Sequence, residues 1–495
     1  MLRASSISQI LLMLLAGASA TLSFAPFNWP AFSLISVTAA YLLLQRSRSG
    51  WHSGWLYGSG FFGAGVSWVY VSIHYHGGMN APVAALMTAL FCVGLGLLFA
   101  LQFYLYKRIF KHPSPIGFAA LWIGFEWLRS WLFTGFPWLY LGYGWIDTPL
   151  ANLAPLGGVW LVSSAVVVLA LLVAFAIQHR ESKTLIAALL LFAGISFVPP
   201  ASIDQSGRSI KLALIQPNIS QSLKWQQSHF DSHIRQLGEL SLEAPDAQWI
   251  IWPETAIPRL INSSFDVLSP WINELNRRSQ ILVSGFPRRE WRDDAERWVY
   301  LNSIGTLTGF PSVYDKQRLV PFGEYIPMES WLRGAIEFFD LPMSSFSLPN
   351  KQSTPLQIGD TPVAASVCYE IAYPELVRSE VNAGTSLMLT VSNDTWFEGS
   401  HGPSQHLQIA RMRALENHRW LIRATNNGHT AVIDPLGRIA AQAPDRSTQV
   451  LQTEVWPSTE STVYQRFGSY PTLLSWLALF VVALIYSRRQ RSFKH

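Results

Sequence analysis

The chain has 495 residues, more than one hydrophobic core usually organises, so at least two structural units are expected. Hydrophobic residues make up 49% of it, charged residues make up only 14%, and 21 residues are Trp. This composition excludes an ordinary soluble protein and favours a membrane protein.

Charge divides the chain into basic ends and a mildly acidic middle. Residues 1–208 hold ten Lys and Arg against four Asp and Glu, and the last eight residues, RRQRSFKH, add four basic residues and no acidic one. The segment 209–487 has 22 basic and 27 acidic residues. It carries no basic stripe with interleaved aromatic residues, so nucleic acid is not expected as a partner.

Long apolar segments occupy the basic ends, and each is about the ~20 residues needed to span a bilayer. Seven precede residue 209 and an eighth lies near the C-terminus: 7–24, 31–45, 54–75, 82–106, 116–133, 158–178, 184–198 and 470–487. A glycine-rich face in the third, GWLYGSGFFGAG, suits close helix packing. The sequence therefore predicts a bundle of eight transmembrane helices. It divides the chain into a membrane domain (1–208), a second domain (209–455) and a C-terminal helix with a basic tail (456–495).

Loop charges predict the orientation of these helices. Basic residues fall in every second connection, at Arg3, at Arg46 and Arg48, at Lys107, Arg108 and Lys111, at Arg180 and Lys183, and in the tail. The positive-inside rule then places both termini in the cytoplasm and the large second domain on the outer side. The first segment has an alternative reading as a cleaved signal peptide, with Ala18, Ser19 and Ala20 at the cleavage site.

The segment 209–455 has a different pattern. Short β-rich runs such as IKLALIQPNI, QWIIWPET, PVAASVCYEI and SLMLTVSND alternate with helical stretches such as SQHLQIARMRALENHRWLI. Continuous apolar strands alternating with helices indicate sheets covered on both faces, and hence an α/β domain. Chemistry in such domains gathers at strand ends.

Three polar residues stand at such ends: Glu254 closes WIIWPE, Lys316 closes SVYDK, and Cys368 closes PVAASVC. A thiol is a weak nucleophile until it is deprotonated, so a nearby carboxylate that takes its proton and a lysine that stabilises anions would complete an acyl-transfer site. Each residue also has a plainer interpretation, as a core cysteine, a helix-capping glutamate or a solvated lysine. Cys92, the only other cysteine, lies inside the fourth span and cannot readily pair with Cys368.

These motifs resemble a known family. WPETAIP around Glu254, YDKQRLVPFGEYIP around Lys316 and SVCYEIAYPELVR around Cys368 are similar to the three catalytic motifs of the nitrilase superfamily of carbon–nitrogen hydrolases. With seven spans before that domain and one after it, the chain resembles the bacterial apolipoprotein N-acyltransferase family over nearly its whole length. The resemblance implies a four-layer αββα nitrilase-like sandwich joined to eight membrane helices.

The resemblance also implies roles for individual residues. Glu254 would be the general base, Lys316 the oxyanion stabiliser and Cys368 the nucleophile that accepts the acyl group. Glu324 and Glu370 would support the site, and Trp225 and Tyr369 would line it. The backbone N–H of Tyr369 would be a second donor to the oxyanion.

The implied reaction moves an acyl chain from a phospholipid, preferably phosphatidylethanolamine, to Cys368 as a thioester. The chain then passes to the α-amino group of the S-diacylglyceryl cysteine that begins an apolipoprotein. Neither a metal nor an organic cofactor is implied, and the expected location is the bacterial inner membrane with the catalytic domain in the periplasm. Two alternatives stay open: a membrane-tethered amidase that shares the triad, and a transporter with an inactive nitrilase-like module.

One segment between the motifs is unusually apolar for an exposed loop. Residues 324–346 read EYIPMESWLRGAIEFFDLPMSSF and include Trp331, Phe338 and Phe339. We predict a mobile lid that enters the outer leaflet and covers the acyl chain; a buried helix is the alternative.

Overall fold

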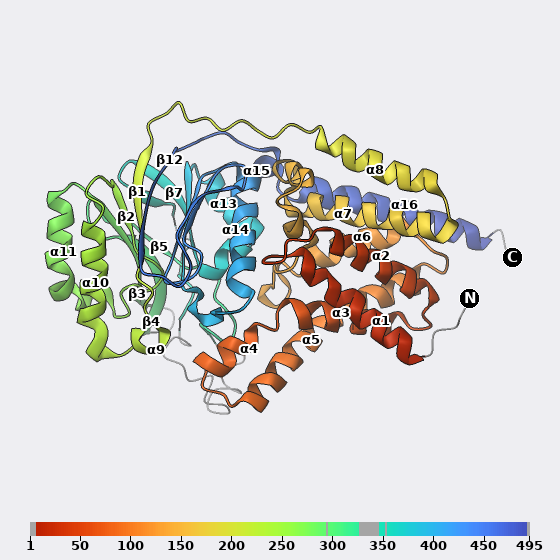
Figure 1. Ribbon diagram of the computed structural model, residues 1–495, viewed down its shortest axis with the longest axis horizontal. Coiled ribbons are helices and arrows are strands. Elements are labelled where there is room, and N and C mark those ends of the chain that lie inside the picture. Colours follow the sequence, from red (N-terminus) through yellow and green to blue (C-terminus); the bar gives the residue numbers. More distant parts are fainter. Residues whose placement is uncertain (1–5, 294–295, 326–345, 352–353, 493–495) are drawn as a thin grey trace. The chain divides into compact units, whose positions relative to one another are not determined.

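The computed structural model describes residues 6–293, 296–325, 346–351 and 354–492 (Figure 1). The chain forms two compact units. The first comprises Met1–Tyr70, Asn80–Pro200 and Thr462–His495, and the second comprises Val71–Met79 and Ala201–Ser461.

The first unit is helical. Its α-helices are α1 (Ser6–Ser19), α2 (Ala31–Arg46), α3 (Gly50–Gly65), α5 (Ala81–Ile109), α6 (Pro115–Leu128), α7 (Ala154–His179), α8 (Ser182–Ser196), α15 (Val463–Phe467) and α16 (Tyr470–Ser492). Polar side chains fix several starts: those of Ser49, Asn80 and Ser114 accept backbone N–H groups in the first turns of α3, α5 and α6. Such caps satisfy donors that a helix leaves without an internal partner.

The apolar segments predicted from the sequence are helical, but they differ in length. Three described helices are long and apolar enough to cross a membrane: Ala81–Ile109, Pro149–His179 and Tyr470–Arg489. Four apolar helices are shorter: Ile7–Ser23, Ala31–Arg46, Pro115–Leu128 and Ser182–Ser196. The number of crossings therefore stays a prediction.

The predicted third span, 54–75, is not one continuous α-helix. Helix α3 ends at Gly65, and Val66 leaves helical geometry with φ −132° and ψ 14°. A short α4 (Val69–Val71) and a π-helical turn (Ser72–His76) follow, and the segment Val71–Met79 belongs to the second unit. Within that unit the His76 ring packs edge-on against Trp396, with 5.5 Å between ring centroids.

Glycine allows α3 and α5 to approach closely, as the glycine-rich pattern predicts. A Cβ built on Gly58 would lie only 2.7 Å from the Cα of Gly96. A methyl group at this position would push the helices apart, because real Cβ atoms do not come this close. Small residues at a contact let helix backbones approach, which favours packing between apolar helices.

One charged pair lies inside the first unit. Glu126 and Arg129 are both buried, and their closest oxygen and nitrogen are 4.0 Å apart. Glu126 also accepts the backbone N–H of Leu141 at 3.0 Å, and Arg129 donates to the carbonyl of Trp138 at 3.1 Å. These bonds compensate for the cost of removing both charges from water.

The second unit contains two six-stranded sheets. The first has the order β12-β1-β2-β3-β4-β5, with β1 (Ile210–Gln216), β2 (Trp249–Ile251), β3 (Ile281–Arg292), β4 (Arg297–Thr306), β5 (Val313–Asp315) and β12 (Gln449–Val455). The second has the order β11-β10-β9-β8-β7-β6, with β6 (Leu356–Ile358), β7 (Thr361–Val367), β8 (Leu387–Ser392), β9 (Leu421–Thr425), β10 (Ala431–Ile433) and β11 (Ile439–Gln442). Strands β1, β2 and β3 run parallel, as do β7, β8 and β9.

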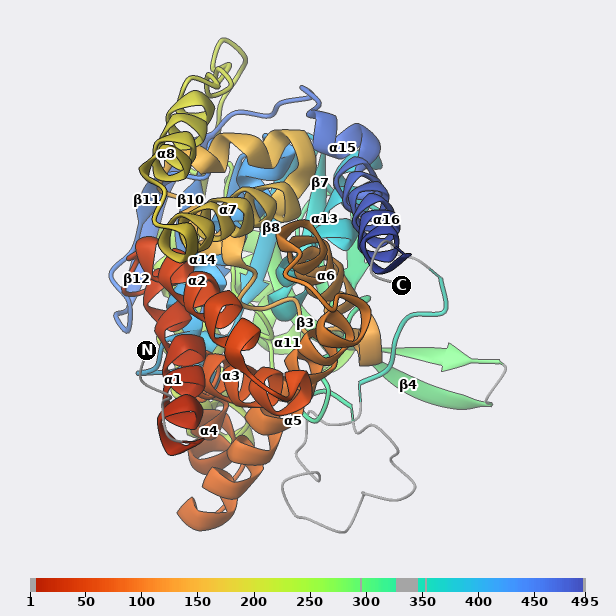
Figure 2. The same cartoon turned by 90° about the vertical axis from the view of Figure 1, so that its right-hand side faces the viewer.

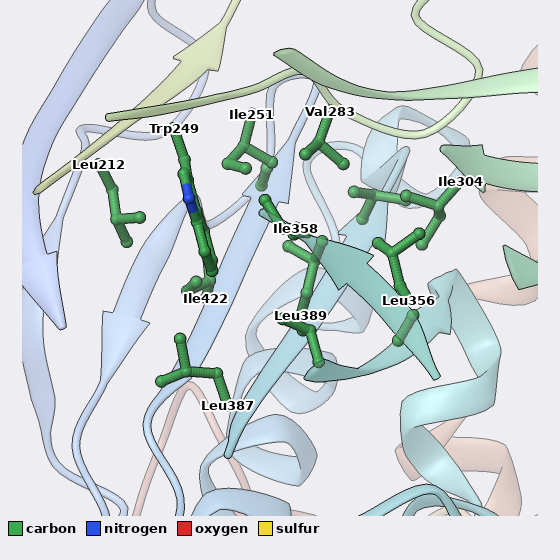
Figure 3. Packing of buried hydrophobic residues seen from close by; sticks show 14 of the residues in the cluster. Leu212, Trp249, Ile251, Val283, Ile304, Leu356, Ile358, Leu387, Leu389 and Ile422 are labelled. Atoms are coloured by element: carbon green, nitrogen blue, oxygen red, sulfur yellow. The ribbon is translucent and has the colours of Figure 1, made fainter. Parts of the chain in front are cut away.

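The two sheets pack face to face through one apolar core. Side chains from both meet there, including Ile251 and Val283 of the first sheet and Leu389 and Ile422 of the second (Figure 3). The outer face of the first sheet is covered by α10 (Phe230–Leu242) and α11 (Phe265–Arg277), and that of the second by α13 (Pro374–Asn382) and α14 (Gly402–Asn417). The result is the predicted four-layer αββα sandwich.

The β3–β4 hairpin extends beyond this sandwich (Figure 2). Near its tip Trp291 and Trp298 face each other across the strands with ring centroids 5.4 Å apart, and both are exposed. The base of the hairpin, in contrast, is buried and carries polar residues of the candidate site.

Candidate active site

Glu254 follows β2, on a loop that packs tightly against β3. The loop turns at Thr255, which has a positive φ of 47°. A Cβ on Gly285 of β3 would lie 2.6 Å from the Thr255 nitrogen and 2.8 Å from the Glu254 Cα. The absence of a side chain at position 285 therefore lets this loop settle on the sheet, with the Glu254 side chain buried.

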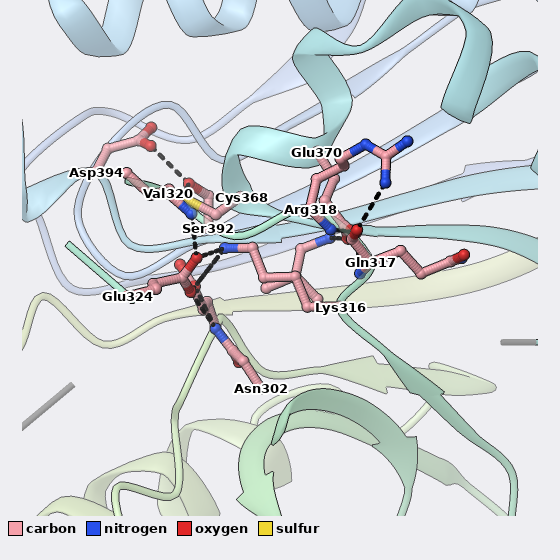
Figure 4. A network of polar contacts seen from close by, with 12 residues as sticks. Asn302, Lys316, Gln317, Arg318, Val320, Glu324, Cys368, Glu370, Ser392 and Asp394 are labelled. Carbon is pink, nitrogen blue, oxygen red and sulfur yellow. Dashed lines mark hydrogen bonds and ion pairs between the residues drawn. The ribbon is translucent and has the colours of Figure 1, made fainter. Parts of the chain in front are cut away.

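Lys316 follows β5 and lies among carboxylates (Figure 4). Its ammonium is 2.8 Å from both oxygens of Glu324 and 3.9 Å from Oε1 of Glu254. Asn302 of β4 donates from one amide to both carboxylates, at 3.0 Å to Glu254 and 2.9 Å to Glu324. The structure thus brings Glu254, Lys316 and Glu324 into one buried cluster, as the motifs predict.

Cys368 stands directly after β7, at a sharp turn into a 3₁₀-helix (Cys368–Ala372). Its φ is 54°, a left-handed conformation that costs a non-glycine residue about 1–3 kcal/mol and recurs at functional sites. The side chain is partly exposed, and its sulfur lies 3.4 Å from the hydroxyl oxygen of Ser392. This turn exposes the thiol at the end of a buried strand.

Glu370 connects the cysteine turn to the lysine loop. Its carboxylate accepts backbone N–H groups from Val367 at 2.7 Å, Gln317 at 2.5 Å and Arg318 at 3.0 Å. Two of these donors directly follow Lys316, and the third directly precedes Cys368. Glu370 therefore fixes the position of one residue against the other, which gives a physical basis for its predicted supporting place.

Burial and charge set the protonation of the cluster. Burial raises the pKa of Glu254, with Lys316 opposing the shift. Burial and Glu254 together hold the pKa of the Cys368 thiol above its ordinary value, although Lys316 lowers it. Burial would lower the pKa of Lys316, but Glu324 and Glu254 outweigh it, so the net pKa is raised. In the resting site Cys368 is therefore held as a thiol and Lys316 as a charged ammonium.

A second polar network contacts Cys368 through Ser392 and His406. Asp394 accepts from Ser392 at 2.6 Å and from Arg423 at 2.6 Å, while His406 Nε2 lies 3.1 Å from the Cys368 carbonyl oxygen. Burial would raise the pKa of Asp394, but Arg423 and His406 hold it below its usual range. The contributions of Asp394 and Arg423 were not predicted from the sequence.

The remaining predicted residues have different outcomes. Trp225 packs with Leu319 and Phe346, and Tyr369 lies edge-on to Tyr373 with centroids 5.3 Å apart. Trp331, Phe338 and Phe339 lie outside the described residues, so the lid stays a prediction. Among the residues that the structure describes, no group of three His, Cys, Asp or Glu side chains is arranged to hold a metal ion.

Comparison with known proteins covers both units. The family model for the N-terminal domain of apolipoprotein N-acyltransferase matches residues 16–172, and that for carbon-nitrogen hydrolase matches residues 211–464. The apolipoprotein N-acyltransferase of Pseudomonas syringae pv. tomato is 44% identical over 97% of both chains. The chain belongs to the apolipoprotein N-acyltransferase family.

More distant members of this family match over the same length. The apolipoprotein N-acyltransferases of Azotobacter vinelandii and Vibrio vulnificus are each 40% identical, over 97% and 96% of this chain and 96% of their own. The match extends through the helical first unit, so the relationship is not confined to the sandwich.

Proposed function

We propose that the protein moves an acyl chain from a membrane phospholipid, through a thioester on Cys368, to the α-amino group of the diacylglyceryl cysteine that begins an apolipoprotein. The observation that carries this proposal is the buried cluster of Glu254, Lys316 and Glu324 beside Cys368. Family membership supports an acyltransferase with a lipoprotein substrate. Phosphatidylethanolamine is the donor that we propose.

In the first half-reaction Glu254 takes the thiol proton as the sulfur attacks the ester carbonyl. The new C–S bond forms, the ester C–O bond breaks, and Glu254 returns the proton to the hydroxyl of the released lysophospholipid. The ammonium of Lys316 stabilises the negative oxygen of the tetrahedral intermediate. The backbone N–H of Tyr369 is the second donor that we propose for this oxygen.

In the second half-reaction the neutral α-amine of the acceptor attacks the thioester carbonyl. The C–N bond forms, the C–S bond breaks, and the amine proton passes by way of Glu254 to the sulfur. The raised pKa of Glu254 supports both steps, because a stronger base accepts the proton more readily. Transfer through a covalent intermediate makes the scheme ping-pong.

We also propose the architecture predicted from the sequence: eight membrane helices, the sandwich in the periplasm and both termini in the cytoplasm. The three long apolar helices and the four shorter ones support a location in the inner membrane. A phospholipid donor suits this location, because the acyl chain need not leave the bilayer to reach an enzyme that is anchored there.

The test is intact mass spectrometry of the protein purified from its membrane. We expect a hydroxylamine-labile acyl adduct on the wild-type chain and on Cys92→Ala, the matched control that removes the other cysteine. We expect no adduct and no product from Cys368→Ala. Product formed by Cys368→Ala from phospholipid and a diacylglyceryl peptide would disprove the covalent scheme.

A product assay separates transfer from the amidase alternative. Wild-type enzyme should convert the diacylglyceryl peptide to its N-acylated form. Release of free fatty acid or ammonia from an amide, with no N-acylated peptide, would favour a hydrolase that uses the same three residues.

A further inference from the structure

A second lysine is buried beside the candidate triad. Lys224 ends the short helix α9 (Gln221–Lys224) and is 4% exposed. Its ammonium donates to the backbone carbonyl of Glu254 at 3.0 Å. This bond holds the base on its loop, at the point where the chain turns through the positive φ of Thr255.

Lys224 differs from Lys316 in its counter-charges. Lys316 lies between the carboxylates of Glu254 and Glu324, whereas no carboxylate within the described ranges forms an ion pair with Lys224. A buried ammonium with a single carbonyl partner is costly, because desolvation is not offset by a contacting anion. Burial accordingly lowers the pKa of Lys224 to about 8, against the opposing effects of Glu254 and Cys368.

The charges that face Lys224 are those of the reacting groups. Glu254 and Cys368 stabilise its charged form, and His233 of α10 is a further titratable neighbour among the residues that the structure describes. The carboxylates Glu254 and Asp394 raise the pKa of the Cys368 thiol, and Lys316 lowers it. Without Lys224 the surroundings of the sulfur would lose one positive charge, and a negative sulfur would be harder to form.

We propose that Lys224 is a positioning residue that acts through Cys368 and Glu254, supplying the second positive charge needed to form the thiolate. The inference rests on the proposed function for its role in acyl transfer. Lys224 acts in both steps in which the sulfur is negative: when the sulfur attacks the phospholipid ester, and when the sulfur leaves the thioester.

The test measures the reactivity of the thiol itself, which does not require acyl transfer. Alkylation of Cys368 by iodoacetamide is followed by mass spectrometry from pH 6 to pH 10 in the full-length protein. In Lys224→Met we expect the alkylation rate at pH 7 to fall about tenfold, as for a one-unit rise in the thiol pKa. The difference from the wild type should shrink above about pH 8, where wild-type Lys224 loses its charge. The control Lys211→Met, which removes an exposed lysine of β1, should leave the profile unchanged.

A second variant separates charge from hydrogen bonding. Lys224→Gln keeps an N–H donor for the Glu254 carbonyl but carries no charge, so it should shift the profile as Lys224→Met does. A wild-type profile in either folded variant would overturn the proposal. Loss of the fold in both variants would also overturn it, because Lys224 would then be required for structure alone.

The result is distinguishable from failure of the proposed function. If wild-type enzyme forms no acyl adduct but Lys224→Met still shifts alkylation, the acyl-transfer scheme fails and the electrostatic role stands. If the adduct forms and Lys224→Met alkylates as the wild type does, the acyl-transfer scheme stands and the electrostatic role of Lys224 fails.

Discussion

Glu370 couples the stability of the fold to pH. Burial raises its pKa from 4.5 to about 7, with Lys316 and the three backbone donors opposing the shift. The folded protein therefore binds this proton more tightly than the unfolded chain does, and stability is lost as pH rises through about 7. We expect thermal unfolding of the wild type to show a decline of up to about 3 kcal/mol between pH 5 and pH 8 from this group.

Glu370→Gln stays neutral at every pH and should flatten that part of the profile. Its amide accepts less well from the three N–H groups, which bears on the stability of the variant at every pH. Because the amide does not titrate, the decline between pH 5 and pH 8 that Glu370 causes should be absent. Glu239→Gln, an exposed change on α10, is the control and should keep the wild-type slope. Parallel pH profiles for Glu370→Gln and the wild type would contradict the assignment.

At the same scale, the sequence predicts some site residues and not others. Glu254, Lys316 and Cys368 are recognisable because each lies at the end of a strand, where chemistry in α/β domains gathers. Their strands, β2, β5 and β7, belong to two different sheets, so the packing of the sheets brings the three side chains together. Lys224 gives no such signal, because it lies in a polar stretch of sequence. Its hydrogen-bond partner, the carbonyl of Glu254, is 30 residues further along the chain. Arg423 is likewise inside a strand, where only the fold shows that its guanidinium reaches Asp394.

Among the elements, the contact between β3 and the Glu254 loop leaves no room for an added side chain at Gly285. Gly285→Ala would place a Cβ 2.6 Å from the Thr255 nitrogen, so either the strand or the loop must shift. We expect Cys368 acylation to slow about 100-fold, the scale expected when a catalytic group is misplaced by about 1 Å. Gly207→Ala, at an open position in the same unit, should acylate at the wild-type rate. Acylation unaffected by Gly285→Ala would mean that the loop does not fix the base.

Helices and strands could be predicted where a short stretch of sequence determines their structure. Continuous apolar runs identified the strands, and the glycine pattern indicated close packing of α3, because both signals lie in neighbouring residues. The partner helix, α5, was not predicted. Strand order was not predictable, since β1 pairs with β12, which lies more than 200 residues away along the chain. The end of α3 at Gly65 was also not predicted. Residues 66–75 are apolar enough to continue a span, and hydropathy does not show that the backbone leaves helical geometry at Val66.

For the whole molecule, the internal contacts of the first unit bear on its orientation. Lys107, in one predicted cytoplasmic connection, donates to the carbonyl of Ser47, in another, at 2.9 Å. The Trp145 indole, between the fifth and sixth predicted spans, donates to Ser33 in the first turn of α2 at 2.9 Å. Two basic connections therefore meet just beyond the end of α2, and the segment around Trp145 contacts the start of the same helix.

This arrangement leads to a test of the complete topology. A reporter fused after Arg208 should lie outside the cytoplasmic membrane, and one fused after His495 should stay inside, because Lys and Arg near helix ends are retained in the cytoplasm. Alkaline phosphatase should accordingly be active only at the first site and green fluorescent protein should fluoresce only at the second. Insertions after Lys111 and after Gly78 serve as internal controls, with the inside pattern expected for the former and the outside pattern for the latter. An odd number of crossings between Lys111 and Arg208 is required for this result, so finding those two sites on the same side would refute the eight-helix arrangement.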